Sequence, residues 1–152
     1  MAKTKYGKYL VKKPVRETDV TVAQKVTGRE FPTMTYMSSD LVPGCNVYLE
    51  FGWIWDMPEP NPHIFEHSHD YDEIVLHIGS DPNHPEDLGA EIEFVVGGEP
   101  LKIDKTSALY VPKGVKHGPL TWKKVKKPHI QMAIILGAGT LAKAAPGGYK
   151  GK

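Results

Sequence analysis

Three histidines and one glutamate in this chain of 152 residues have the spacing of ligands to a single metal ion. His67 and His69 are two residues apart, Glu73 follows four residues later, and His117 comes just after the turn-forming sequence Pro112-Lys-Gly114. In an extended segment alternate side chains point the same way, so the two histidines face one side, and Glu73 can join them if the strand re-enters the sheet after a kink. Imidazole nitrogens with one carboxylate suit a divalent transition metal and not calcium or magnesium.

The two parts of this ligand set resemble the two sequence motifs of the cupin superfamily. The pattern HxHxxxE at His67–Glu73 is similar to the first motif, and PxGxxH at Pro112–His117 is similar to the second. The resemblance implies a small antiparallel β-barrel that encloses one metal ion. It also implies the metal ligands, which would be His67, His69, Glu73 and His117.

The rest of the chain predicts an all-β fold. Thirteen prolines and fifteen glycines break it into short segments, which favours many short strands over long helices. Alternating or β-rich stretches predict strands at 46–55, 73–78, 90–96, 100–103, 108–111 and 130–136. We therefore expect a single antiparallel β-barrel of the cupin or jelly-roll type with an extended N-terminal arm. The expected division is an arm with edge strands at 1–44, the barrel at 45–139 and a C-terminal tail at 140–152.

Bulk composition excludes several classes of function. The formal net charge of +1 provides no global field that would favour nucleic acid. The single cysteine, Cys45, cannot form an internal disulfide, which fits a reducing compartment. No segment approaches the roughly 18 apolar residues of a membrane span, and the first residues lack the apolar stretch of a secretory signal. We expect a cytoplasmic protein that binds neither nucleic acid nor membranes.

The basic N-terminal stretch has two interpretations. Lysines between residues 3 and 13 are interleaved with Tyr6, Tyr9 and Leu10. A nucleic-acid-binding arm would need this composition, but so would a solvated edge strand that is protected by lysines, which we favour. Arms before a cupin barrel commonly pair with a second subunit, so the resemblance implies a homodimer.

The cavity beside the metal is expected to bind a small organic molecule that carries an oxygen anion. Its candidate wall residues are apolar or aromatic: Trp53, Trp55, Phe65, Tyr71, Tyr110 and Met132. The candidate proton-transfer residues are His77, Tyr48 and Glu93, and each depends on a strand parity that a shift of one residue would reverse. The remaining histidines, His63, His84 and His129, lie beside prolines and are expected at the surface.

The predicted site permits more than one chemistry. Four protein ligands leave one or two open positions on the metal, which we expect to be Fe, Mn, Ni or Zn. With Fe(II) these positions could take oxygen, and a dioxygenase is the interpretation we favour. With the other metals a redox-neutral isomerase, lyase or decarboxylase is expected. A non-catalytic cupin that binds a small ligand remains an alternative, because the fold does not decide the function.

Overall fold

The computed structural model describes residues 4–16 and 25–140, and nearly all of its regular elements are strands, which confirms the predicted all-β class. No helix within these residues has the length and hydropathy needed to cross a membrane. A short 3-10 helix, η1 (Gly7–Tyr9), precedes the strands. The strands are β1 (Val15–Arg16), β2 (Thr27–Arg29), β3 (Met34–Met37), β4 (Val47–Glu59), β5 (Asp72–Gly79), β6 (Asp87–Val96), β7 (Glu99–Lys105), β8 (Ser107–Val111), β9 (His117–Val125) and β10 (His129–Leu136).

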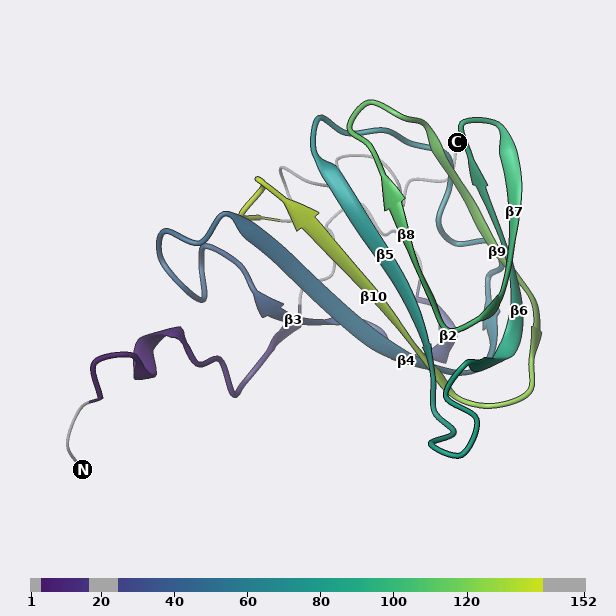
Figure 1. Ribbon diagram of the computed structural model, residues 1–152, viewed down its shortest axis with the longest axis horizontal. Helices are drawn as coiled ribbons and strands as arrows, with labels where there is room; N and C mark the ends of the chain where they lie inside the picture. The colour runs from purple at the N-terminus through teal and green to yellow at the C-terminus, as the bar shows by residue number, and fades with distance from the viewer. Residues whose placement is uncertain (1–3, 17–24, 141–152) are drawn as a thin grey trace.

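The strands form two antiparallel sheets that face each other (Figure 1). The seven-stranded sheet has the order β1-β3-β4-β10-β5-β8, with β2 also paired to β4, and the three-stranded sheet has the order β7-β6-β9. In the described part of the chain neither sheet closes on itself, so the predicted single closed barrel is corrected to two facing sheets. Closure depends on which edge strands pair, whereas sequence alternation reports only which face of a strand is buried.

The space between the sheets holds the main hydrophobic core. Ile54 and Val75 from the larger sheet pack with Ile92, Phe94 and Trp122 from the smaller one. Burying each large apolar side chain contributes about 1.5–3 kcal/mol, so this cluster fixes how the two sheets face each other. Burial alternates along β4 and β5, and the same alternation directs several polar side chains into the interior.

The last residues of the described N-terminal arm pair with the larger sheet of the same chain. Val15 and Arg16 of β1 pair with Thr35 and Met34 of β3, and Arg16 Nη1 lies 2.6 Å from Glu30 Oε2. Residues 4–13 extend away from the two sheets and are exposed apart from a half-buried Val11 (Figure 1). Pairing of this arm with a second subunit stays a prediction. The predicted C-terminal tail lies outside the described residues apart from Thr140.

Candidate metal centre

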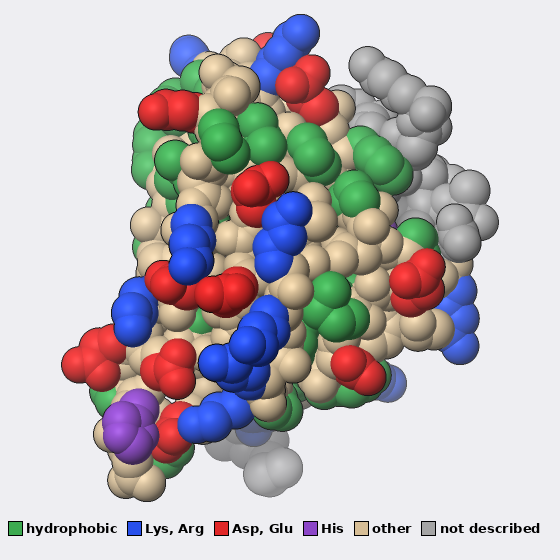
Figure 2. Space-filling model, turned by 90° about the vertical axis from the view of Figure 1, so that its right-hand side faces the viewer, with side chains coloured by type: hydrophobic (Ala, Val, Ile, Leu, Met, Phe, Trp, Pro, Cys, Tyr) green, Lys and Arg blue, Asp and Glu red, His purple; other side chains and the backbone are tan. Residues whose placement is uncertain are grey.

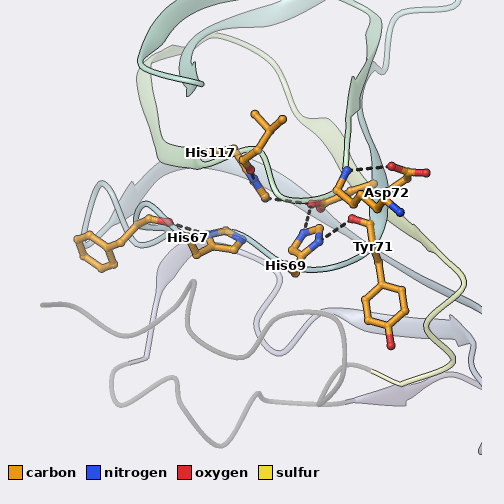
Figure 3. A network of polar contacts seen from close by, with 9 residues as sticks. His67, His69, Tyr71, Asp72 and His117 are labelled. Carbon is orange, nitrogen blue, oxygen red and sulfur yellow. Dashed lines mark hydrogen bonds and ion pairs between the residues drawn. The ribbon is translucent and has the colours of Figure 1, made fainter.

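Three imidazoles meet at one end of the space between the sheets. His67 and His69 lie in the segment before β5, and His117 begins β9. One ring nitrogen from each lies within 4.8 Å of the other two, and Figure 3 shows the rings turned toward one another. His69 and His117 are buried, and His67 is half-buried. The structure thus brings together the three histidines that the sequence singled out as ligands.

Backbone carbonyls fix the orientation of all three rings. Nδ1 of His67 lies 2.7 Å from the Phe65 carbonyl, Nδ1 of His69 lies 2.8 Å from the Tyr71 carbonyl, and Nδ1 of His117 lies 2.8 Å from the Val115 carbonyl. A carbonyl only accepts hydrogen bonds, so each Nδ1 carries the proton and donates it. In the neutral imidazole this leaves the lone pair on Nε2, and three such lone pairs point into one small volume.

Glu73 supplies negative charge at the same point. Its Oε2 lies 2.9 Å from His69 Nε2 and 3.2 Å from His117 Nε2. The second contact is off the direction of a hydrogen bond, so His117 Nε2 is buried with no hydrogen-bond partner among the described residues. Burial raises the pKa of Glu73, but the neighbouring His117 and His69 outweigh burial and hold the pKa at about 2. Glu73 is therefore a carboxylate at every pH of interest.

The pKa values of His67 and His69 shift in opposite directions, because only His69 has a carboxylate at hydrogen-bond distance. Burial lowers the pKa of His67, and the hydrogen bond to Phe65 only partly offsets it. Burial also acts to lower the pKa of His69, but the hydrogen bond to Glu73 and the negative charge of Glu73 outweigh the effect of burial, so the pKa is raised. His69 therefore keeps a proton on Nε2, directed at Glu73, to a higher pH than an ordinary histidine, and a metal held by His69 and Glu73 would have to displace that proton.

A backbone bridge and a local turn hold the two motifs against each other. His67 and His117 form an antiparallel bridge, with both backbone N–H groups donating at 2.9 Å. A Cβ at Gly118 would collide with the Phe65 carbonyl, and its φ of 108° also favours glycine, so this close approach requires Gly118. In the Pro112–Val115 turn, Gly114 has a φ of 79° and donates to the His69 carbonyl at 2.9 Å.

The residues present fit a divalent transition metal. The donor set is three neutral imidazoles and one carboxylate, the tautomers are fixed by backbone acceptors, and one buried Nε2 lacks a partner. Hydrogen bonding of the outer ring nitrogen is the usual arrangement of a metal-bound histidine. A hollow at the surface, lined by Glu66, His67, Ser68 and Lys116, opens beside the site. This arrangement can hold a cation that remains within reach of solvent and of a small molecule.

Four of the six predicted wall residues lie on the outer face of the larger sheet, and the other two lie in the segment before β5. Trp53, Trp55 and Tyr110 are 38%, 53% and 53% exposed, and strand parity places Met132 with Trp53 on the outer face. These four side chains point away from the interior, contrary to expectation. Phe65 and Tyr71 are half-buried, and their carbonyls orient His67 and His69.

The three predicted proton-transfer residues lie in different surroundings. Tyr48 is buried in the interior, one strand beyond Ile135, which pairs with Glu73. His77 is 1% exposed and also faces the interior, four residues beyond Glu73 along β5. Glu93 lies on the outer face of the smaller sheet and forms an ion pair with Lys123 at 3.8 Å, so it does not face the metal centre.

Sequence reasoning missed an interior carboxyl, Glu50. Its Oε2 accepts hydrogen bonds from Tyr48 at 2.9 Å and from Thr33 at 3.0 Å, and the Tyr48 hydroxyl also contacts Thr35 at 2.9 Å. Burial raises the pKa of Glu50 above its usual range, and the charge of Glu73 acts in the same direction against these hydrogen bonds. The signal was present: Glu50 shares the parity of Tyr48 and Ile54 in the predicted strand 46–55.

A second group of histidines lies deeper between the sheets. His63 and His129 are 8% and 0% exposed, contrary to the prediction that prolines beside them mark surface positions, whereas His84 is exposed. Arg29 Nη1 lies 2.8 Å from His63 Nε2, and Trp122 Nε1 donates to His129 Nε2 at 3.1 Å. Proline ends regular pairing but does not decide which way the next side chain points.

Comparisons with known proteins find similarity at the level of structure alone. No family model matches the sequence, and no curated protein matches it. The chain is similar to a predicted oxalate decarboxylase from Thermotoga maritima, with 12% identity over 82% of this chain and 91% of that chain and a TM-score of 0.49. For an RmlC-like cupin from Shewanella frigidimarina the identity is 12% over 82% and 96%, with a TM-score of 0.46.

A third similar structure is a sugar phosphate isomerase from Silicibacter pomeroyi, described as a member of the cupin superfamily, with 10% identity and a TM-score of 0.46. The match covers 72% of this chain but only 59% of the isomerase. The chain is thus similar to solved structures described as cupins, the superfamily that its two motifs resemble. At these identities and TM-scores the similarity assigns no reaction, substrate or metal to this chain.

Proposed function

We propose that the protein is a metal-dependent enzyme that acts on a small organic molecule through an oxygen atom of that molecule. The observation that supports this most strongly is the convergence of one ring nitrogen from each of three histidines, each of which has its Nδ1 at hydrogen-bond distance from a backbone carbonyl. A histidine cluster that only filled space would not need the same tautomer at every ring. The ligands would be His67, His69, His117 and Glu73, and the metal would be Fe, Mn, Ni or Zn.

A bound divalent metal would act as a Lewis acid on a carbonyl, enolate or carboxylate oxygen. Three neutral imidazoles and the Glu73 carboxylate would leave one net positive charge at the site, which favours an anionic oxygen as the next ligand. The half-buried His67 and the hollow beside it provide the side from which a small molecule can approach. The protein's part in the reaction is then to orient that molecule and to move protons.

Glu50 and Tyr48 are the groups best placed for proton transfer. Register puts Glu50 in a row with Ala133 and Val75, directly beside the row of Tyr48, Ile135 and Glu73. Ala133 is the small residue between Glu50 and Val75, so little side-chain volume separates Glu50 from the space beside the site. The raised pKa keeps the Glu50 carboxyl protonated to a higher pH than an ordinary glutamate, and a buried acid of this kind can donate and recover a proton.

This pair favours a redox-neutral reaction such as isomerisation, elimination or decarboxylation. Each of these needs a group that delivers or accepts a proton beside a polarised oxygen, and Glu50 with the Tyr48 hydroxyl supplies one. The Fe(II) dioxygenase is retained as a second candidate because three histidines and one carboxylate also suit Fe(II) with open positions. A cupin that only binds a ligand would need no such proton-transfer pair.

Metal reconstitution would separate these possibilities. Protein stripped with a chelator is loaded separately with Fe(II), Mn, Ni or Zn and assayed with and without oxygen on hydroxy acids, diketones, sugars and phenols. Turnover without oxygen, or metal-dependent exchange of substrate C–H hydrogen with deuterated water, supports the redox-neutral reaction. Turnover only with Fe(II) and oxygen supports the dioxygenase. No turnover with any metal across the panel would contradict an enzymatic function.

A matched pair of variants tests the role of Glu50. Glu50→Gln keeps the size of the side chain but removes the exchangeable carboxyl proton, and we expect kcat to fall by about 10²–10⁴-fold with metal content unchanged. Glu93→Gln removes a carboxylate from the outer surface and should leave kcat unchanged. Equal activity of the two variants would exclude Glu50 from proton transfer.

A further inference from the structure

The inner side of strand β10 is buried at both ends but accessible to solvent in the middle. Regular pairing with β4 and β5 places His129, Gln131, Ala133 and Ile135 on this inner side. His129 and Ile135 are 0% and 4% exposed, whereas Gln131 and Ala133 between them are only half-buried. The two sheets therefore do not pack closely over the middle of β10, and Gln131 and Ala133 line the space that is left.

Two polar atoms on this inner side have no hydrogen-bond partner among the described residues. Arg29 Nη1 donates to Gln131 Oε1 at 2.9 Å, and because a guanidinium only donates, this contact fixes which end of the amide is oxygen. The amide nitrogen Nε2 of Gln131 is left without a partner, yet it is accessible to solvent, unlike the buried Nε2 of His117. The same holds for Glu50 Oε1, because Thr33 and Tyr48 both donate to Oε2. Gln131 therefore presents a hydrogen-bond donor to the space between the sheets.

Gln131 lies beyond Glu50 along the direction that leads away from the metal centre. On β10, Ile135 pairs with Glu73, Ala133 pairs with Glu50, and Gln131 comes two residues farther from Ile135. At about 3.4 Å per residue, the row of Glu50 lies roughly 7 Å and the row of Gln131 roughly 14 Å from the row of Glu73. A ligand that extends from the metal past Glu50 therefore meets Gln131 Nε2.

Arg29 makes this part of the interior favourable for negative charge. Its side chain is 7% exposed, and Nη1 contacts two neutral groups, the Gln131 amide and His63 Nε2 at 2.8 Å. After burial, the positive charge of Arg29 helps to lower the pKa values of His63, His77 and His129, so its field extends through this part of the interior. An anionic oxygen at Gln131 Nε2 would receive a hydrogen bond and lie close to this charge, and both effects stabilise it.

We propose that Gln131 binds a second, negatively charged oxygen of the molecule whose first oxygen binds the metal, and that Arg29 is the positioning residue that orients the Gln131 amide. The inference rests on the proposed function, since the metal is the first anchor of the ligand. The substrate class is then a short chain with an oxygen group at one end and a carboxylate or phosphate at the other. Glu50 would lie beside the middle of this chain, where a proton-transfer group is needed.

The spacing of the rows sets the length of the ligand. Of the roughly 14 Å between the rows of Glu73 and Gln131, a metal–oxygen bond and a hydrogen bond take about 5 Å. An extended chain advances by about 1.2 Å per bond, so the remaining distance corresponds to a chain of about six carbons between the two oxygens.

Adipate and hexanoate are a matched pair of probes for this site. Both are chains of six carbons with a carboxylate that can bind the metal, and only adipate has a second carboxylate for Gln131. Calorimetry on protein loaded with Zn(II) measures both dissociation constants, and we expect adipate to bind at least about 10-fold more tightly, the effect of one hydrogen bond to a charged group. Zinc-loaded protein that binds both equally would overturn this inference alone. Protein that takes up no zinc would overturn the metal-dependent function and the inference with it.

A matched pair of variants locates the second carboxylate. Gln131→Met keeps the length of the side chain but removes the amide donor, so the preference for adipate should disappear while zinc content and hexanoate affinity stay unchanged. The control is Lys123→Met on the outer face of the smaller sheet, where Lys123 pairs with Glu93 at 3.8 Å among the basic and acidic side chains seen in Figure 2. This variant should keep the preference. A folded Gln131→Met that still prefers adipate, or loss of the preference in Lys123→Met, would overturn the proposal.

A measurement on the unaltered chain covers the case in which Gln131→Met does not fold. The sequence contains only two glutamines, Gln24 and Gln131, so the side-chain amide signals of Gln131 can be assigned by NMR. We expect adipate to shift these signals in the zinc-loaded wild type and hexanoate to leave them in place, because only adipate reaches Nε2. Gln131 amide signals that stay unchanged when the protein is saturated with adipate would overturn the proposal.

Discussion

The histidines buried between the sheets should make the metal-free protein lose stability as the pH falls below neutral. Burial, together with the positive charge of Arg29, lowers the pKa of His63 to about 3, that of His77 to about 3 and that of His129 to about 4. In the unfolded chain the same groups titrate near pH 6.5. Below that pH these histidines bind protons in the unfolded chain but not in the folded chain, so protonation favours unfolding.

The magnitude follows from the two sets of pKa values. At pH 5 an unfolded histidine with a pKa of about 6.5 has gained about 2 kcal/mol from protonation relative to pH 8. The folded pKa values lie about a unit or more below pH 5, so the folded state gains almost nothing there. Three such groups together lower the free energy of unfolding by about 6 kcal/mol, which is comparable to the about 5–15 kcal/mol total of a typical domain.

Urea unfolding followed by circular dichroism between pH 5 and pH 8, with a chelator present, measures this effect. His77→Gln removes one of the three groups and should reduce the loss between pH 8 and pH 5 by about 2 kcal/mol. His84→Gln is the control, because His84 is exposed and should leave the pH dependence unchanged. His69 acts in the opposite direction, since Glu73 raises its pKa, and comparing variants removes this contribution. An identical pH dependence for wild type and His77→Gln would refute the reasoning.

Four further predictions concern the metal centre and the arm. His69→Ala should lower bound metal from one per chain to below about 0.1 by elemental analysis, because one of four ligands is lost, and full retention would contradict the ligand assignment. Glu73→Gln should weaken metal affinity by at least about 10-fold and turnover further, measured by competition with a chelating dye and by kcat. Metal affinity should fall about tenfold per pH unit below the raised pKa of His69, because binding must displace that proton, and a flat titration would exclude this. Deleting residues 1–13 should shift the protein toward monomer in light scattering, because the arm is predicted to pair with a second subunit, and an unchanged dimer or a monomeric wild type would contradict this.

The sequence by itself determined the class of fold and predicted which residues meet at the candidate metal centre. The spacings of His67, His69, Glu73 and His117 are local properties of extended chain and of one glycine turn, so they could be read without tertiary structure. The strands at 73–78, 90–96 and 130–136 were predicted for the same reason, because strong alternation and β-forming residues specify a strand locally. Local rules were sufficient wherever the relevant contacts lie close together in the chain.

Only the tertiary structure decided which side of each strand meets the site. Glu50 and Glu93 are both carboxyls on predicted strands, yet Glu50 faces the interior and Glu93 faces solvent. Trp53 is on the outer face, whereas Ile54, the next residue, is fully buried. A strand whose alternate residues are apolar on both faces, such as β4, carries no local signal for which face is inside.

The pairing of distant segments likewise lay beyond the sequence. His63 is buried against Arg29 of β2, and His129 is buried against Trp122 of β9. The prolines beside the two histidines in the sequence give no indication of either contact. The same holds for the arrangement as two facing sheets rather than one closed barrel, which depends on which edge strands pair. Sequence pattern specifies each strand and its periodicity, but orientation and edge pairing are set by the free energy of packing the whole chain, to which residues far apart in sequence contribute together.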